Sequence, residues 1–169
     1  ASWRAIGRFL EIADKHGIRP VFVLFDSCWN PRPAAGKQPA PRAHVHNSGW
    51  VQSPGAAILG DPAKHDGLKP YVIGVIGRFK NDSRILAWDL FNELDNDNGG
   101  RFTAHEAKDK QANALLLLRK AFAWAREADP SQPLSSGIWR GDFEHPNELR
   151  ENPARKLGRD QLPRLRDPA

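Results

Sequence analysis

The chain has 169 residues, of which 40% are hydrophobic and 27% charged, so it can bury the core of one ordinary domain. The net charge of +5 comes from Lys and Arg residues scattered among acids over most of the chain, and we expect no nucleic-acid partner. No apolar run reaches the ~18 residues of a membrane span, so we expect no membrane partner. The single cysteine, Cys28, excludes an internal disulfide, and its position after an apolar run favours a packing residue over a nucleophile.

The first expected element is an amphipathic helix. Its apolar residues recur at helical spacing, at Trp3, Ile6, Phe9, Leu10 and Ala13. Gly17 follows where the glycine that ends a helix belongs. Residues 21–25 are rich in β-branched and aromatic side chains and apolar on both faces, which predicts a strand covered by helices and ending at Asp26.

Residues 27–60 carry prolines and glycines without a sustained period, which predicts a long loop. Asp61 and Pro62 then provide an N-cap and a first-turn proline for a helix whose apolar residues reach Phe79. Pro70 is expected near the start of the main part of this helix or at a kink.

A second strand is predicted over 85–91. Thr103 and Glu106 have the spacing of a capping box, which predicts a helix that begins there and ends at Asp129. Residues 134–139 form the third predicted strand. Helices that alternate with strands in this way indicate parallel β/α units with right-handed crossovers, so the predicted fold class is α/β.

The most informative motif is Trp88-Asp89-Leu90-Phe91-Asn92-Glu93, in which an amide and a carboxyl side chain follow an apolar strand. Parallel α/β sheets carry their chemistry at this edge. Neighbouring residues of a regular strand point to opposite faces, so Asn92 and Glu93 reach one pocket only if the pleat is lost there. From spacing alone, a solvated glutamate in a turn at the strand end fits the motif better than a catalytic residue does.

This motif resembles the fourth-strand motif of clan A glycoside hydrolases of the family 5 type, in a cellulase-like subgroup often labelled as β-1,4-xylanases. The resemblance extends from residues 13–20 to residues 135–139. It implies that Glu93 is the acid/base and that Asn92 binds the 2-hydroxyl of the sugar being cleaved. It also implies a partial (β/α)8 TIM barrel, in which the three strands match the third, fourth and fifth of the family.

The function implied is that of a portion of a retaining glycoside hydrolase acting on β-1,4-linked polysaccharide, whether glucan, xylan or mannan. In the family the nucleophile is a second glutamate on the seventh strand, and no residue here takes that role. The isolated chain is therefore expected to be inactive. The alternative left open is a non-catalytic carbohydrate-binding or vestigial barrel fragment.

Further substrate-binding candidates lie at or beyond strand ends: Asp26, Trp29, Trp50 and Trp139. A tryptophan face suits the C–H groups of a sugar ring, and a carboxylate suits its hydroxyls. For the tryptophans, loop or core packing remains the alternative. For Asp26, helix or turn capping is the preferred interpretation, and sugar binding is the alternative.

No cofactor is expected. His44 and His46 lack a firm third metal ligand. Residues 95–99 resemble part of a calcium loop but lack the later glutamate, so a hydrogen-bonded turn is the preferred interpretation.

The expected domain organisation is a partial barrel over 1–143, followed by an irregular, basic, proline-containing tail over 144–169. An oligo- or polysaccharide is the expected partner. Self-association through the open side of the barrel is also expected, because three strands cannot close a barrel. The resemblance suggests that the full-length protein is secreted or periplasmic.

Overall fold

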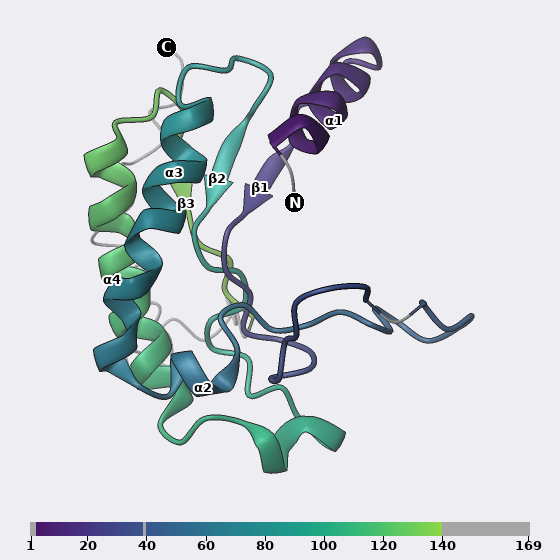
Figure 1. Cartoon of the computed structure of the whole chain (residues 1–169), viewed down its shortest axis with the longest axis vertical. Helices are drawn as coiled ribbons and strands as arrows, with labels where there is room; N and C mark the ends of the chain where they lie inside the picture. Colours follow the sequence, from purple (N-terminus) through teal and green to yellow (C-terminus); the bar gives the residue numbers. More distant parts are fainter. Residues whose placement is uncertain (1–2, 39, 140–169) are drawn as a thin grey trace, which may run out of the picture.

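A computed structural model describes residues 3–38 and 40–139, which form a parallel sheet flanked by helices (Figure 1). The strands are β1 (Val21–Val23), β2 (Ala87–Asp89) and β3 (Leu134–Ser135), in that spatial order, and both pairs are parallel. The helices are α1 (Trp3–Lys15), α2 (Ala56–Leu59), α3 (Lys69–Phe79) and α4 (Lys110–Ala128), with 3₁₀ segments η1 (Pro62–Leu68) and η2 (Gly100–His105). The predicted α/β class with parallel β/α units is confirmed. The open three-stranded sheet is part of the pattern that a (β/α)8 barrel repeats.

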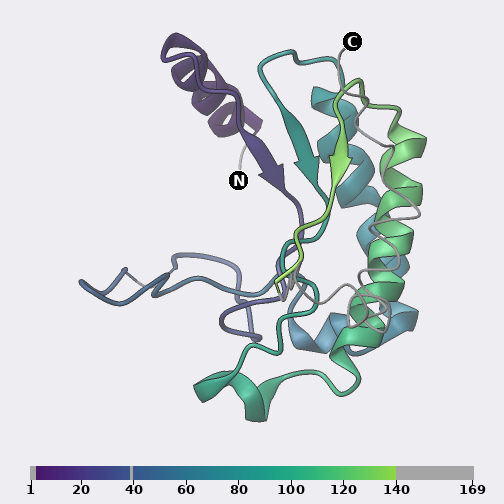
Figure 2. The ribbon, with the colours of Figure 1, turned by 180° about the vertical axis from the view of Figure 1, so that it is seen from behind.

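Helices cover one face of the sheet. Figure 2 shows α3 and α4 running together along this face. Phe22 of β1 and Trp88 of β2 are partners in the strand register, and their rings stack with centroids 5.7 Å apart. Phe9 of α1 meets Phe22 edge to face at 5.9 Å. Trp88 is 1% exposed and belongs to one cluster with the buried side chains of α3 and α4. Burial of this apolar face is the main term that stabilises the fold.

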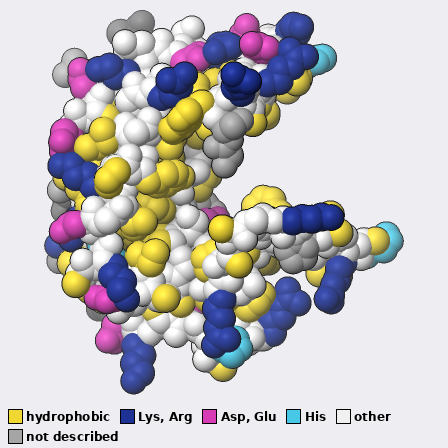
Figure 3. Space-filling model, in the orientation of Figure 1, with side chains coloured by type: hydrophobic (Ala, Val, Ile, Leu, Met, Phe, Trp, Pro, Cys, Tyr) yellow, Lys and Arg dark blue, Asp and Glu magenta, His cyan; other side chains and the backbone are white. Residues whose placement is uncertain are grey.

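The other face of the sheet lacks such a cover within the described residues. Val21 and Val23 of β1 are each 47% exposed. Figure 3 shows a broad hollow between the arm formed by α1 and the arm formed by the loop after β1, with apolar side chains gathered on the body of the molecule beside it. Self-association through the open side stays a prediction.

The first helix ends as expected. Gly17 has a φ of 67°, which a residue with a side chain adopts only with strain. The N–H of Gly17 donates to the Asp14 carbonyl (3.0 Å) and that of Ile18 to the Ala13 carbonyl (2.9 Å), so both satisfy carbonyls of the last helical turn.

The strands are shorter than predicted. Beyond Ser135 the chain contacts β2 and its extension through side chains: Ser136 Oγ donates to the Phe91 carbonyl (2.7 Å), and the Gly137 N–H donates to Asp89 Oδ1 (3.2 Å). Regular pairing over 134–139 therefore stops after two residues, and that over 85–91 is confined to β2.

The helix predicted after Asp61 is divided in two. Asp61 accepts from the Ala63 N–H (3.2 Å) as an N-cap should, but the first segment is η1. The α-helix begins only at Lys69, with Pro70 in its first turn, where the missing N–H of proline costs nothing. In the predicted loop over 27–60, α2 was missed because it has only four residues.

The capping box at Thr103 and Glu106 is wrong. Glu106 follows η2 in an extended conformation, and α4 begins at Lys110. The Glu106 carboxylate instead forms a buried ion pair with Lys110 (3.0 Å). This charged hydrogen bond is stronger than the bond to a backbone N–H that would cap a helix.

The predicted tail over 144–169 and the domain boundary at 143 lie outside the described residues. Among the helices of the described ranges, none is long and apolar enough to cross a membrane.

Candidate active site

Asn92 and Glu93 follow β2 at the carboxyl edge of the sheet. Asn92 still pairs with the chain leaving β1, because its N–H donates to the Phe25 carbonyl (2.8 Å) and its carbonyl accepts from the Ser27 N–H (3.2 Å). Glu93 does not continue the strand, since its φ of 49° lies in the left-handed region. The pleat is therefore lost at Glu93, which allows both side chains to reach one pocket.

A pocket of about 440 Å³ opens at this edge. All six residues predicted to bind or cleave a sugar line it: Asp26, Trp29, Trp50, Asn92, Glu93 and Trp139. They come from the loop after β1, the turn after β2 and the segment after β3. Parallel strands bring these three segments together although they are far apart in sequence.

The Glu93 carboxylate is half-buried and held through one oxygen. Its Oε2 accepts from Cys28 Sγ (2.9 Å) and from Asn96 Nδ2 (2.9 Å). Oε1 has no hydrogen-bond partner among the described residues. The two donors thus fix the side chain and leave the other oxygen available for a proton or a ligand.

Cys28 was predicted to be a packing residue, and it is buried, with 4% exposure. Its contact with Glu93 could not be predicted from an isolated cysteine. Burial, then the hydrogen bond to Glu93, and then the charge of Asp26 raise the pKa of the Cys28 thiol far above its usual range. The sulfur therefore stays protonated, as a donor to Glu93 must be, and is a poor nucleophile.

Asp26 and Asn92 form a second fixed unit beside Glu93. Asn92 Nδ2 donates to Asp26 Oδ2 (2.9 Å), and Asp26 Oδ1 accepts from the Cys28 N–H (2.7 Å). Asp26 thus caps its own turn, as the preferred interpretation had it, and also holds Asn92. The third segment passes close by at Gly137, where an added Cβ would lie 2.5 Å from Asn92 Oδ1.

Asp89, the last residue of β2, is a further buried carboxyl of this edge and was not predicted as a site residue. Its Oδ1 accepts from the N–H groups of Phe91 (3.1 Å) and Gly137 (3.2 Å). Desolvation raises the pKa of Asp89, and these two hydrogen bonds only partly oppose it. Asp89 holds the chains after β2 and β3 together.

The three tryptophans of the pocket differ in exposure. Trp50 is 58% and Trp139 is 54% exposed, so both present aromatic surface to solvent at the pocket. Trp29 is half-buried, and its ring meets those of His46 and Trp50 edge to face, at 5.3 and 6.5 Å. Trp50 and Trp139 therefore leave flat apolar ring surface open at the pocket.

A buried polar network behind the pocket was missed entirely. Asn98 holds both backbone groups of Trp29: its Oδ1 accepts from the Trp29 N–H (2.8 Å) and its Nδ2 donates to the Trp29 carbonyl (2.5 Å). The same Nδ2 donates to Glu106 Oε1. Lys110 Nζ donates to the Ser27 carbonyl (2.6 Å) as well as to Glu106, with 7% and 8% of these two side chains exposed. The network fixes the loop that carries Asp26, Cys28 and Trp29.

The sequence did hold a signal for part of this network. Lys110 has helical spacing to the apolar residues Ala114, Leu117 and Ala121, which puts it on the buried face of α4. A lysine on a buried helix face must find a partner. Asn98 gives no such signal, because it stands in a polar run where every residue suits a turn.

The segment 95–99 is a hydrogen-bonded turn region, as preferred. The N–H of Asn98 donates to Asn96 Oδ1 (2.7 Å), and the Asn98 side chain is committed to Trp29. Within residues 3–38 and 40–139, no group of three His, Cys, Asp or Glu side chains is placed to hold a metal ion.

Comparison with known families identifies the class. A parallel β/α sheet with an Asn-Glu pair in a tryptophan-lined pocket at its carboxyl edge is the arrangement expected of a clan A glycoside hydrolase. The sequence model of glycosyl hydrolase family 10 matches residues 44–140, more than half of the chain, and the chain belongs to that family. A search of curated proteins and a search of solved structures each found no match.

The clan A assignment from sequence is therefore confirmed, whereas the family that matches is family 10, and the narrower resemblance to family 5 is not borne out. The family is one of (β/α)8 barrels with glycosidase activity on β-1,4-linked polysaccharide of the xylan type. The three described strands are part of such a barrel. Their assignment as the third, fourth and fifth strands stays a prediction.

Proposed function

We propose that this chain carries the acid/base half of a retaining β-1,4-glycosidase, with Glu93 as the acid/base. The observation that supports the proposal most is the state of the Glu93 carboxylate. One of its oxygens is fixed by Cys28 and Asn96, and the other has no partner in the described part of the chain. An acid/base group needs this combination of a fixed orientation and a free oxygen at a substrate pocket.

The chemistry assigned to Glu93 is protonation of the leaving group. In the first step a nucleophilic carboxylate attacks the anomeric carbon, the glycosidic C–O bond breaks, and Glu93 gives its proton to the departing oxygen. In the second step Glu93 takes a proton from water, whose oxygen displaces the carboxylate. Asn92, at the same pocket and held by Asp26, is placed to bind the 2-hydroxyl of the sugar.

We assign no nucleophile. Retaining enzymes hold their two carboxyl groups ~5–5.5 Å apart. Asp26 is engaged by Asn92 and a backbone N–H, Asp89 holds two backbone N–H groups, and Glu106 is paired with Lys110 in the buried network. We therefore expect the chain alone not to hydrolyse unactivated xylan.

An external nucleophile tests Glu93 without that second carboxylate. With azide present, azide can attack the anomeric carbon of an aryl β-xylobioside while the aryl oxide leaves and takes a proton from the acid. We expect the azide-dependent rate on the phenyl glycoside, whose oxygen needs protonation, to fall at least tenfold in Glu93→Gln. The rate on the 2,4-dinitrophenyl glycoside, which departs unaided, should change less than threefold.

The matched control is Glu127→Gln. Glu127 is on α4, in an exposed ion pair with Lys69 (2.8 Å), and its loss should affect neither rate. Equal losses on both substrates in Glu93→Gln would refute the acid role.

A second candidate is a non-catalytic carbohydrate-binding protein, favoured by the lack of a free second carboxylate among the described residues that line the Glu93 pocket. Calorimetry with xylohexaose separates the two. Binding that depends on Trp50, without any azide-dependent turnover, would support the second candidate and contradict the first. Failure to bind xylohexaose, together with failure of turnover, would overturn both.

A further inference from the structure

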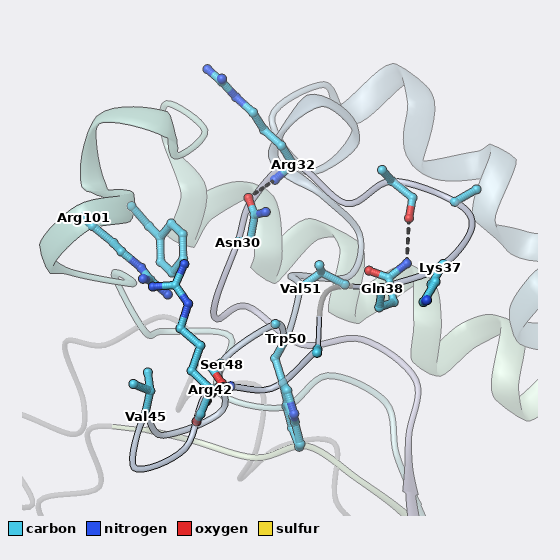
Figure 4. A pocket seen from close by; sticks show the side chains of 15 residues that line it. Asn30, Arg32, Lys37, Gln38, Arg42, Val45, Ser48, Trp50, Val51 and Arg101 are labelled. Carbon is cyan, nitrogen blue, oxygen red and sulfur yellow. Dashed lines mark hydrogen bonds between the residues drawn. The ribbon is translucent and has the colours of Figure 1, made fainter.

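A second cleft adjoins the Glu93 pocket. It has a volume of about 550 Å³ and is formed by the loop after β1 together with Arg101 and Phe102 of η2. Four cationic residues line it and no acidic residue does; we call it the basic cleft and define it by Arg32, Lys37, Arg42 and Arg101 (Figure 4). Trp50, Arg101 and Phe102 line both the cleft and the Glu93 pocket, so one extended ligand can occupy the two.

The charges of the basic cleft are not compensated within the described residues. Elsewhere in the described ranges, six cations form ion pairs with acids: Arg8, Lys64, Lys69, Arg84, Lys110 and Lys120. None of the four residues of the basic cleft is in an ion pair of the described part of the structure. Arg101 lies over the Phe102 ring at 4.6 Å, and Arg32 contacts His105 Nδ1 at 3.2 Å. These contacts orient the guanidinium groups without neutralising them.

The arrangement favours an anionic ligand. In Figure 4 the side chains of Arg42 and Arg101 extend toward one another along one side of the cleft, although like charges repel. An anion between them would relieve this repulsion, and guanidinium groups bind carboxylates through two parallel hydrogen bonds. Trp50, which is 58% exposed, adds an aromatic face on which a sugar ring can stack.

We propose that the basic cleft binds a carboxylate-bearing sugar, so that the preferred substrate is an acidic β-1,4-glycan with uronic acid units. The neutral backbone would pass Glu93 while a uronic acid unit occupies the cleft. This inference rests on the proposed function for the path of the chain. A nucleic acid is the weaker occupant, because the adjoining pocket is lined by the acidic residues Asp26 and Glu93, which would repel a phosphate backbone that continues from the cleft.

The test compares three oligosaccharides by calorimetry on the full chain: a neutral β-1,4-xylo-oligosaccharide, the same with one glucuronic acid branch, and the latter with its carboxyl reduced to the alcohol. We expect the acidic ligand to bind roughly tenfold more tightly than either neutral one, which the charged hydrogen bonds of one arginine–carboxylate pair supply. The ratio should decrease as salt increases.

The variant Arg32→Gln/Arg42→Gln should reduce the affinity ratio of acidic to reduced ligand to about one. The matched control is Arg4→Gln/Arg8→Gln on α1, which removes the same charge away from the cleft and should leave the ratio unchanged. Equal affinity of the native chain for the acidic and reduced ligands would overturn the proposal. So would a single-stranded oligonucleotide that displaces the acidic ligand at equal concentration.

The failure of the proposed function is distinguishable from the failure of this inference. Suppose that the acidic ligand binds more tightly in a way that depends on Arg32 and Arg42, but Glu93→Gln lowers the azide-dependent rate equally on both aryl glycosides. The basic cleft would then stand, and the acid role of Glu93 would be refuted. Turnover that depends on Glu93 without any acid preference would do the reverse.

Discussion

The covered face of the sheet and its carboxyl edge are stabilised by different interactions. On the covered face, Trp88, Ile76 and Leu117 are at most 1% exposed and contribute through burial of apolar area. At the edge, Asn98, Lys110 and the side chain of Glu106 are also buried, but each contributes through specific hydrogen bonds. The covered face can exchange one apolar side chain for another of similar volume, whereas the edge depends on particular atoms.

The difference shows where precision is needed. The apolar cluster positions whole elements, and the buried polar network positions single loops to within a hydrogen bond. Ser27 and Trp29 are held by Lys110 and Asn98 through their backbone groups, so their placement does not depend on their own side chains. The side chains of Cys28 and Trp29 are thereby left available to contact Glu93 and to line the pocket.

The largest expected effect is on the polar side of this comparison. Lys110→Met leaves the Glu106 carboxylate buried without its cation, which should cost about 4 kcal/mol of unfolding free energy. In Lys110→Met/Glu106→Gln, no charge is left buried, and we expect less than half of that cost. Urea unfolding followed by circular dichroism measures both, with an osmolyte added to secure a folded baseline. A double variant less stable than the single one would show that the pair does not act as a unit.

On the apolar side, Leu117→Ala should cost about 3 kcal/mol, because it removes a fully buried side chain and leaves a cavity. Leu116 is its neighbour on α4 and is 44% exposed, so Leu116→Ala is the matched control and should change stability by less than about 1 kcal/mol. Urea midpoints of the two variants give the comparison. Similar losses in both would mean that α4 packs by a different face.

The two regions also differ in how far the sequence predicts them. Periodicity located α1, the parallel β/α units and the covered face, because many residues carry the same signal. The motif at Asn92 and Glu93 located the pocket. The contacts of Cys28 with Glu93 and of Asn98 with Trp29 were missed, because the partners are distant in sequence and no local pattern encodes them. Glu106 was misjudged as a helix cap, because its spacing from Thr103 fits a capping box although its carboxylate pairs with Lys110. The end of the third strand was predicted too far along the chain. After Ser135 the backbone-to-backbone hydrogen bonds are replaced by bonds that involve side chains, from Ser136 Oγ to the Phe91 carbonyl and from the Gly137 N–H to Asp89 Oδ1.

The pH dependence of stability probes the edge through Asp89. Its folded pKa is raised above the ordinary value of 3.8, so the folded state holds the proton more tightly. The resulting stabilisation is present below pH 3.8 and is lost as pH rises through the folded pKa. Asp89→Asn keeps an oxygen for the Phe91 and Gly137 N–H groups without the buried charge. We expect the variant to equal the native chain in acid and to exceed it in stability at neutral pH.

Asp82 provides the opposite control. Arg84 lowers the pKa of Asp82 through a side-chain hydrogen bond, so its stabilisation is present above the ordinary pKa and is lost as pH falls. Asp82→Asn should therefore lose stability at neutral pH and approach the native chain in acid. Urea titrations between pH 3 and pH 7 measure both variants. A parallel response of the two variants would contradict the assigned causes.

The smallest expected effects concern two glycines of the α1 region, Gly7 and Gly17. Neither belongs to the buried polar network. Gly7 in the helix and Gly17 after it both have open space around an added Cβ, so packing does not distinguish them. Their backbones do: Gly7 is helical, whereas Gly17 has a φ of 67°. Gly7→Ala should stabilise the chain by about 0.5–1 kcal/mol, because alanine loses less conformational entropy in a helix. Gly17→Ala should destabilise it by about 1 kcal/mol, because a side chain is strained in the left-handed region. Opposite shifts of the urea midpoint are the expected result. Shifts of the same sign would mean that the two variants change stability through contacts rather than through backbone conformation. The stability of α1 would then depend on particular contacts, as that of the carboxyl edge does.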